Sequence, residues 1–270
     1  MPGFTHAQKS FSRPAHGAEL IRFEDLHISF GPKHVFEGLS LTVMEGEILT
    51  VMGGSGMGKS VLLKTLIGLL SPDRGRVIFE GQDLSDFSES DFLPVRRRIS
   101  MVFQGAALFD SLTVGENISY PIREHFPEMP EVDLQKRVAQ KLALVNLPGI
   151  EAMKPSDLSG GMRKRVGLAR AIAIDPEVIL WDEPTTGLDP ISSRMIDRLI
   201  LSMKRKLDCT SIVVTHDIDS AFGVSDRIAM IAKKKIVQVG TVEEMRASKQ
   251  PEVRSFFTAR QGERERGAVP

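Results

Sequence analysis

The stretch Gly53-Gly54-Ser55-Gly56-Met57-Gly58-Lys59-Ser60 decides the fold of this chain. It matches the phosphate-loop pattern G-x-x-x-x-G-K-[ST] at every fixed position. The apolar run at 48–52 predicts a buried strand before the loop, and apolar residues at helical spacing from Val61 to Leu69 predict a helix after it. A strand, a glycine-rich turn and a helix start together make an anion site. The glycines let backbone N–H groups crowd a phosphate, and the helix N-terminus adds partial positive charge.

Individual residues of this loop have expected roles towards a nucleotide. The Lys59 ammonium can reach the β- and γ-phosphates, and the Ser60 hydroxyl can ligate Mg²⁺. The predicted nucleotide-binding residues of this region are Gly53, Gly54, Ser55, Gly56, Met57, Gly58, Lys59, Ser60 and Val61. A chance match to the pattern is the alternative, and the strand and helix predicted on either side of the loop argue against it.

Composition excludes several classes of protein. Charged residues make up 26% and hydrophobic residues 41% of the 270, which is ordinary for a soluble globular domain. The 35 basic residues balance the 35 acidic ones, so net charge does not argue for nucleic acid as a partner. No run approaches the roughly 18 apolar residues of a transmembrane helix. The lone Cys209 suits a reducing compartment and is expected to be a small buried hydrophobe.

The order of predicted elements indicates an α/β fold, a P-loop NTPase (RecA-like) core with a mainly parallel sheet covered on both faces. Alternating apolar residues up to position 43 predict an N-terminal antiparallel β-subdomain. Residues 105–157 predict an inserted α-helical subdomain. We expect one catalytic domain over 19–248 and a charged tail over 249–270. Residues 1–18 lack the apolar core of a secretory signal, and because they are polar and contain two prolines they are expected to form a disordered leader.

Prolines and polar residues set several local predictions. A turn is expected at 72–75, and a loop with one helical turn at 83–94. A helix from Val114 is expected to end at Pro121. The next helix shows one apolar stripe, and Asp133 stands where it could cap the start of that helix.

Two acidic residues, Asp182 and Glu183, directly follow the apolar run at 178–181. Strand ends are where open α/β sheets place their ligands. Asp182 is therefore expected to hold Mg²⁺ beside Ser60, and Glu183 to act as general base for a water that attacks the γ-phosphate. The alternative is a surface turn that begins with two acidic residues, and the phosphate loop earlier in the chain favours the catalytic interpretation.

The chain carries a second glycine-containing turn, Ser159-Gly160-Gly161, before a predicted helix. A hydroxyl and two glycines at a helix N-terminus can hold a γ-phosphate. Taken alone, the stretch fits a plain helix cap better. The basic residues 163–165, one turn into that helix, fit either a solvated face or a source of positive field near a phosphate.

These motifs occur in the order and at the spacing of one family. The elements that resemble the nucleotide-binding subunit of an ABC transporter are the phosphate loop, Gln104, LSGGM at 158–162, Asp182-Glu183, Gly187-Leu188-Asp189 and His216. The resemblance covers residues 20–245. It implies ATP and Mg²⁺ as cofactors and ATP hydrolysis as the activity. It also implies a homodimer in which Ser159, Gly160 and Gly161 of one copy close over ATP held by the other.

The same resemblance assigns roles to single residues. Phe30 would stack on adenine, and Gln104 would contact Mg²⁺ or the lytic water and sense the permease. His216 would bond the γ-phosphate, and Asp189 would lie at the dimer seam. Without the resemblance to the family, Phe30 would also fit the pattern of an apolar strand residue. His216 would likewise fit a histidine with a structural role. The resulting catalytic set is Glu183, His216, Gln104 and Lys59, and the resulting metal ligands are Ser60, Gln104 and Asp182.

Three residues depart from the pattern of the family. Met162 replaces the usual signature Gln, Gly54 a common Pro, and Phe30 the commoner Tyr. None of these changes removes a charge or a metal ligand, so hydrolysis is still expected.

Four stretches, 105–110, 120–125, 158–176 and 182–191, look closer to one branch, the ATPases of Mla/MCE-type phospholipid transporters. That likeness implies phospholipid transport between the inner and outer membranes, at the cytoplasmic face of the inner membrane. It implies three partners: an integral-membrane permease, an MCE-domain lipid-binding protein and, in some members, a small STAS-domain protein. The alternatives are an importer ATPase for amino acids or other small solutes, a non-transport ABC ATPase, and a catalytically dead binding module. Every catalytic position is filled, which argues against the last.

Overall fold

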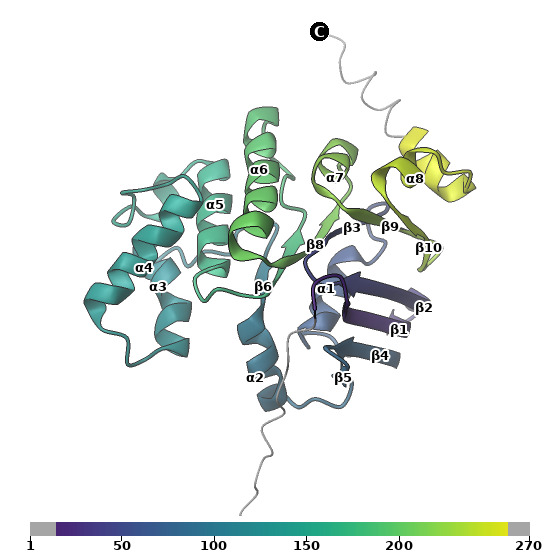
Figure 1. The fold of residues 1–270 in the computed structure, drawn as a ribbon, viewed down its shortest axis with the longest axis horizontal. Helices are drawn as coiled ribbons and strands as arrows, with labels where there is room; N and C mark the ends of the chain where they lie inside the picture. Colours follow the sequence, from purple (N-terminus) through teal and green to yellow (C-terminus); the bar gives the residue numbers. More distant parts are fainter. Residues whose placement is uncertain (1–14, 259–270) are drawn as a thin grey trace, which may run out of the picture.

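The computed structural model describes residues 15–258 (Figure 1). The expected leader at 1–18 lies outside the described residues except for its last four. The part of the expected tail beyond residue 258 lies outside them as well. Within the described range, no helix is long and apolar enough to cross a membrane.

A six-stranded sheet forms the centre of the molecule. Its spatial order is β10-β9-β3-β8-β7-β6, and all neighbours are parallel except the β9–β10 hairpin. The strands are β3 (Ile48–Met52), β6 (Ile99–Val102), β7 (Val178–Asp182), β8 (Thr210–Thr215), β9 (Arg227–Ala232) and β10 (Lys235–Gly240). Every residue of β3, β7 and β8 is buried, as expected for parallel strands covered on both faces. The predicted P-loop core with a mainly parallel sheet is confirmed.

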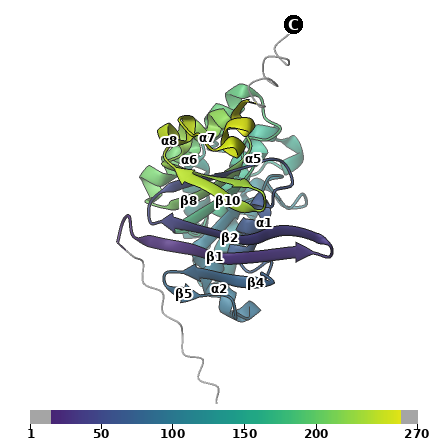
Figure 2. The same ribbon diagram turned by 90° about the vertical axis from the view of Figure 1, so that its right-hand side faces the viewer.

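A second, antiparallel sheet has the order β2-β1-β4-β5 and lies in a separate layer (Figure 2). Its strands are β1 (Glu19–Phe30), β2 (Lys33–Met44), β4 (Arg74–Phe79) and β5 (Gln82–Asp83). The turn predicted at 72–75 is wrong in its second half, because β4 already begins at Arg74. Gly75 is in the left-handed region (φ +96°), and a Cβ there would lie 2.4 Å from the Asp25 carbonyl oxygen. This glycine therefore permits a close approach of β4 to β1 within the sheet rather than marking a turn.

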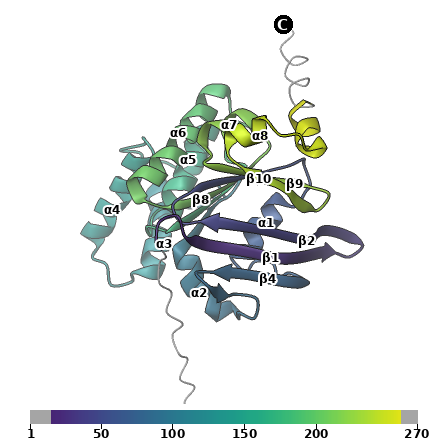
Figure 3. The ribbon, with the colours of Figure 1, turned by 45° about the vertical axis from the view of Figure 1, so that its right-hand side comes forward.

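Helices fill the space between the two sheets and cover the far face of the parallel sheet. Helix α1 lies between the sheets (Figure 3), where its Leu62, Leu63 and Leu66 pack against apolar side chains from both. Helices α3 to α6 pack in a second apolar cluster with Trp181 of β7. The helices are α1 (Lys59–Leu66), α2 (Glu89–Arg98), α3 (Val114–His125), α4 (Glu131–Leu144), α5 (Gly160–Ala171), α6 (Pro190–Leu207), α7 (Ile218–Val224), α8 (Val242–Arg246) and a 3₁₀ turn, Pro155–Asp157.

Helix α2 corrects the loop predicted at 83–94. A capping box starts this helix: Ser88 N donates to Asp91 Oδ2 at 3.0 Å, and Asp91 N donates to Ser88 Oγ at 3.4 Å. Pro94 lies inside the helix, where it removes one backbone donor without ending the helix, and Phe92 and Val95 are buried on either side of it.

Two further predictions about the helical part were wrong. Helix α3 continues through Pro121 to His125, and its last turn is anchored by the fully buried Ile122. Asp133 does not cap α4, because the N-cap position is Pro130, whose φ of −59° already suits a helix start. Asp133 instead lies in the first helical turn, where its negative charge favours the positive end of the helix dipole.

The charged tail does not begin at residue 249. Residues 251–258 are helical, and Val253 in this helix is completely buried. Phe256 and Phe257 pack with Phe222 of α7 in a third apolar cluster. These apolar side chains explain why the described part of the predicted tail folds onto its own chain.

Candidate nucleotide site

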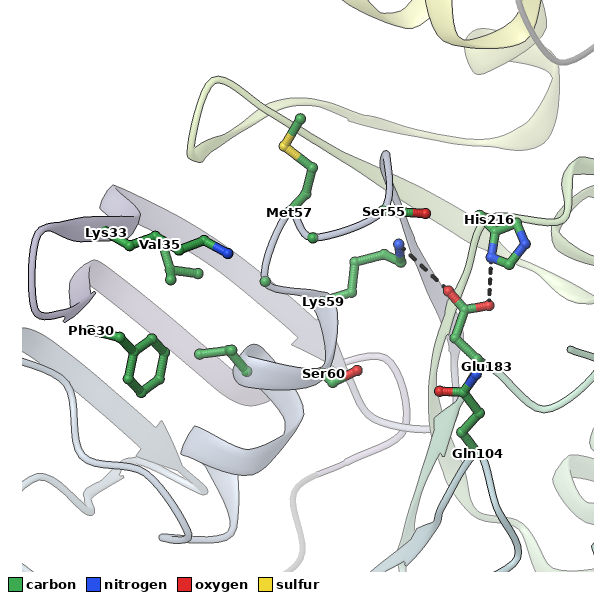
Figure 4. Close-up of a pocket in the computed structure, with 13 residues that line it drawn as sticks. Phe30, Lys33, Val35, Ser55, Met57, Lys59, Ser60, Gln104, Glu183 and His216 are labelled. Atoms are coloured by element: carbon green, nitrogen blue, oxygen red, sulfur yellow. Dashed lines mark ion pairs between the residues drawn. The ribbon is translucent and has the colours of Figure 1, made fainter.

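A cavity of about 400 Å³ lies where one end of the antiparallel sheet meets the phosphate loop (Figure 4). Its lining residues are Phe30, Lys33, Val35, Ser55, Gly56, Met57, Gly58, Lys59, Ser60, Val61, Gln104, Glu183 and His216. All of these were predicted from the sequence except Lys33 and Val35. These two lie on β2 just after the hairpin, and Lys33 pairs with Phe30 across it. Neither residue belongs to a motif that indicates a nucleotide contact, whereas the pairing of β1 with β2 could have suggested one.

The phosphate loop packs tightly against β2. Gly58 caps α1 with a left-handed φ of +87°, and a Cβ there would lie 2.4 Å from Val35 Cγ1 and 2.8 Å from the Phe36 ring. Only glycine satisfies both the backbone conformation and the contact. The loop is therefore held against the antiparallel sheet, next to the half-exposed ring of Phe30.

The side chain of Lys59 folds back across the loop. Its Nζ donates to the carbonyl oxygens of Gly53 at 2.9 Å and Gly54 at 3.2 Å, and it lies 3.5 Å from Glu183 Oε1. Because the side chain is 7% exposed, its positive charge is held inside the site rather than in solvent. Gly53 and Gly54 do not line the cavity. Their carbonyl oxygens instead accept the hydrogen bonds that hold the Lys59 side chain in place.

Ser60 and Asp182 present oxygen atoms to one another at the floor of the loop. Ser60 Oγ donates to Asp182 Oδ1 at 2.6 Å. Burial raises the pKa of the Asp182 carboxyl, and the bond from Ser60 offsets part of that rise. A hydroxyl and a carboxylate are ligands that Mg²⁺ prefers, and a cation would relieve the cost of burying the carboxylate, so the pair fits this ion.

Glu183 is the most strongly constrained acid of the site. Its backbone is left-handed (φ +49°), although it is not glycine, and its N–H donates to the Val214 carbonyl at 2.9 Å. Its Oε2 lies 2.8 Å from His216 Nδ1 and accepts a bond from Thr186 Oγ1 at 3.0 Å. Figure 4 shows Lys59 and His216 meeting the two oxygens of this carboxylate. Strain of this kind is common where a catalytic group must be held in one orientation.

Gln104 and His216 reach the cavity from two strand ends. Gln104 follows β6, and His216 follows β8. Because β6, β7 and β8 are neighbours in parallel register, their carboxyl ends meet at one edge of the sheet. The topology explains how residues far apart in the sequence share one site. Thr186, which holds Glu183, was not predicted, since a threonine in a turn carries no special signal.

The residues predicted to face a second copy lie outside this cavity. Ser159 is the N-cap of α5, and its Oγ accepts a bond from Met162 N at 3.2 Å. Asp189 is the N-cap of α6, and its Oδ1 accepts bonds from Ile191 N at 2.9 Å and Ser192 N at 3.0 Å. The plain cap that the sequence allowed for Ser159 is therefore present. Ser159, Gly160 and Asp189 are all exposed on the surface, which leaves them accessible to a partner.

The basic residues at 163–165 form neither of the two predicted arrangements in full. Arg165 Nη1 donates to the carbonyl oxygens of Val145 and Asn146, at the end of α4. Lys164 Nζ donates to carbonyl oxygens of the turn that follows β7. Arg163 Nη1 donates to the Leu158 carbonyl oxygen at 2.9 Å, so all three cations are directed at backbone acceptors of the same chain.

A family model described as ABC transporter matches residues 36–186 of the chain. The chain belongs to the ABC transporter family. It is 40% identical over 240 residues to the intermembrane phospholipid transport system ATP-binding protein MlaF of Escherichia coli K12, covering 89% of each chain. It is 41% identical over 238 residues to MlaF of Haemophilus influenzae, covering 88% of this chain and 90% of that protein.

A second kind of relative has another name and a longer chain. The probable ribonucleotide transport ATP-binding protein mkl of Mycobacterium tuberculosis H37Rv is 41% identical over 240 residues. The match covers 89% of this chain and 67% of mkl.

Solved structures of this family have the same fold. CbiO1 of Clostridium perfringens, part of the ABC transporter complex cbiONQ, superimposes with a TM-score of 0.78 at 30% identity, covering 87% of this chain and 93% of its own. The cassette MJ0796, in a dimeric post-hydrolysis state bound to ADP and Pi, superimposes with a TM-score of 0.76 at 30% identity. The match covers 83% of this chain and 99% of the MJ0796 chain. This chain is accordingly an ABC-type ATPase that binds ATP.

Proposed function

We propose that this chain is the ATP-hydrolysing subunit of a transporter that moves phospholipid between the inner and outer membranes through a partner permease. The observation that carries the proposal is the similarity to MlaF of two species, which runs over about nine-tenths of each chain. The branch-specific stretches 105–110 and 120–125 agree with it, because they belong to the region where ABC permeases dock a coupling helix.

The residues of the cavity have separate roles in binding and hydrolysing ATP. Phe30 stacks on the adenine, and the loop glycines and Lys59 hold the phosphates with N–H groups and positive charge. Ser60, Asp182 and Gln104 would hold Mg²⁺, which would supply neutralising charge for the phosphate oxygens. Positioning and electrostatic stabilisation supply most of the catalysis in reactions of this kind.

Glu183 and His216 act on the water and on the γ-phosphate. The Glu183 carboxylate orients the attacking water and accepts its proton. His216, paired with Glu183 through Nδ1, keeps Nε2 available for the γ-phosphate. The contacts of Glu183 with Lys59 and Thr186 keep the carboxylate turned towards the loop.

We also propose that two copies act as a head-to-tail homodimer. ATP then lies between Lys59 and Ser60 of one copy and Ser159 and Gly161 of the other. Three observations support this arrangement: each chain holds one copy of each phosphate-gripping element, Ser159 and Gly160 are exposed, and the similar cassette MJ0796 is dimeric. On this proposal the dimer sits at the cytoplasmic face of the inner membrane with the permease. An MCE-domain lipid-binding protein and, as in some members of the branch, a small STAS-domain protein complete the complex.

The test is to purify the full chain with the membrane protein that accompanies it and to place the complex in liposomes. An MCE-domain partner, together with ATP-dependent transfer of a fluorescent phospholipid that Glu183→Gln abolishes, supports the proposal. A permease served by a solute-binding protein, with uptake of an amino acid or ribonucleotide and no lipid transfer, overturns it. Ribonucleotide uptake is tested because the relative mkl is named as a probable ribonucleotide transport protein.

A further inference from the structure

Lys164 links the start of helix α5 to the turn that carries Glu183. It lies in the second turn of α5, one turn beyond the cap at Ser159, and it points inward whereas its neighbour Arg163 is exposed. Its Nζ donates to the carbonyl oxygens of Pro184 at 2.9 Å and Thr186 at 2.6 Å. These carbonyl groups belong to the turn between β7 and α6, which begins at Glu183.

That turn also holds the Glu183 carboxylate. Thr186 Oγ1 donates to Glu183 Oε2 at 3.0 Å, and Thr186 N donates to the Glu183 carbonyl oxygen at 3.3 Å. Lys164 therefore fixes the main chain of the residue whose side chain orients the carboxylate. A continuous path of hydrogen bonds runs from α5, through Lys164 and Thr186, to Glu183.

The charge of Lys164 strengthens this link. Burial lowers the pKa of the Lys164 ammonium, and the negative charge of Glu183 opposes that shift. Hydrogen bonds from a charged donor are stronger than those between neutral groups, and the Lys164 side chain is partly shielded from solvent. The two carbonyl oxygens are thus well-defined anchors for the side chain.

We propose that Lys164 is a positioning residue, which couples the placement of the α5 N-terminus to the orientation of Glu183 in the same chain. This inference rests on the proposed role of Ser159-Gly160-Gly161 as the clamp on the neighbour's ATP. A phosphate seated at that N-terminus shifts or steadies α5, and Lys164 transmits the change to the Pro184–Thr186 turn. Each copy then orients its own Glu183 for catalysis only when its helix α5 has bound the nucleotide held by the other copy.

The test is steady-state ATP hydrolysis by the full chain carrying Lys164→Met, which keeps the unbranched shape and most of the length of the side chain and removes its donors. We expect kcat to fall about 10-fold to 100-fold, because a small displacement of a catalytic group has that effect, while KM and the dissociation constant of ATP change by less than about twofold. Lys164→Arg, which retains several donors, should recover most of the lost kcat.

Arg165→Met is the matched control, because Arg165 lies on the same helix and donates to the carbonyl groups of Val145 and Asn146 instead of the catalytic turn. It should leave kcat within about twofold of the wild type. Thr186→Val cuts the path at its other end and should lower kcat without raising KM, so it tests the link even if Lys164→Met does not fold.

The proposal is overturned if Lys164→Met keeps kcat, if it raises KM instead, or if Arg165→Met loses as much turnover. Thr186→Val with unchanged kcat also overturns it. These assays measure ATP turnover alone, so a failure of lipid transfer to a reconstituted membrane leaves their outcome unaffected.

Discussion

The Nδ1 atom of His216 lies 2.8 Å from the Oε2 atom of Glu183, and this contact joins the ends of two neighbouring parallel strands. Asp182 pairs with Val214 in the register of β7 and β8, so the residues that follow each strand are brought together by the sheet itself. Because Nδ1 faces the carboxylate, Nε2 is the ring nitrogen that remains for another contact. The contact thus constrains the orientation of the imidazole ring as well as that of the acid.

Glu183→Gln tests the general base. The amide keeps the size of the side chain but cannot accept the proton of the attacking water. We expect kcat to fall by about 10²-fold to 10⁴-fold while ATP binding is retained. Phosphate release and nucleotide binding measured on the same preparation check this, with Glu128→Gln, an exposed acid in the loop before α4, as the control. Unchanged turnover would remove Glu183 from the role of base.

His216→Ala tests the partner of that base. Its removal frees Glu183 Oε2 from one of its two fixed contacts and takes a hydrogen-bonding group from the γ-phosphate position. We expect kcat to fall about 10-fold to 100-fold, with a smaller change in KM. A structural role alone would instead appear as a loss of thermal stability with normal kcat, which a melting curve beside the kinetic assay distinguishes.

Asp182→Asn separates stability from catalysis. Burial raises the pKa of this carboxyl above its unfolded value, so its ionisation costs stability at pH values above the folded pKa, and the cost disappears as pH falls below the unfolded pKa. Without nucleotide, the variant should melt at a higher temperature than the wild type at pH 7, because the amide carries no charge to bury. The difference should shrink towards pH 4.

The same variant should lose Mg²⁺-dependent hydrolysis, because a neutral amide is a poorer ligand for the ion than a carboxylate. Ser60 Oγ can still donate to the amide oxygen, so the loop should keep its shape. A variant that melts below the wild type at pH 7, or that hydrolyses ATP at the normal rate, would contradict this account.

Phe30→Ala tests the adenine platform. The ring is 48% exposed at the end of β1 and borders the cavity, so little folding energy depends on it. Stacking of a base on an aromatic side chain contributes about 1–3 kcal/mol, so KM for ATP should rise between about 5-fold and 150-fold with kcat nearly unchanged. Phe30→Tyr is the control that keeps the ring. If alanine leaves KM unaltered, the base lies elsewhere.

The sequence could predict the parts of the fold that local chemistry determines. The phosphate loop, the buried run of β7 and the acids after it follow from composition and spacing. Lys33 and Val35 could not be found this way, because only the pairing of β1 with β2 brings them to the loop. Helix α2 was predicted only as a loop with one helical turn because residues 83–94 are polar, although the sequence contains the Ser88–Asp91 capping box that starts the helix. Lys164 was recognised only as a surface or field charge, since its acceptors are backbone atoms of a distant turn.

Arg98 joins the two sheets, and its replacement should be the most destabilising change outside the site. Its Nη1 donates to the Glu80 carboxylate, just after β4, at 2.7 Å. Its Nε and Nη2 donate to the Glu177 carboxylate, just before β7, at 2.7 Å and 2.6 Å. The Glu80 side chain is 1% exposed. Removing the cation would therefore leave a buried carboxylate without its charge partner, which typically costs about 3–5 kcal/mol.

Urea denaturation of Arg98→Met and of Arg123→Met measures this cost with a matched control. Arg123 pairs with Glu131, but both side chains are more than half exposed, so solvent screens the pair and its loss should cost less than about 1 kcal/mol. The same experiment on Arg98→Lys should give an intermediate loss, because one ammonium cannot reproduce the forked contacts of a guanidinium with two carboxylates. Equal losses in Arg98→Met and Arg123→Met would show that the sheets are held together by their apolar contacts with α1 and not by this cluster.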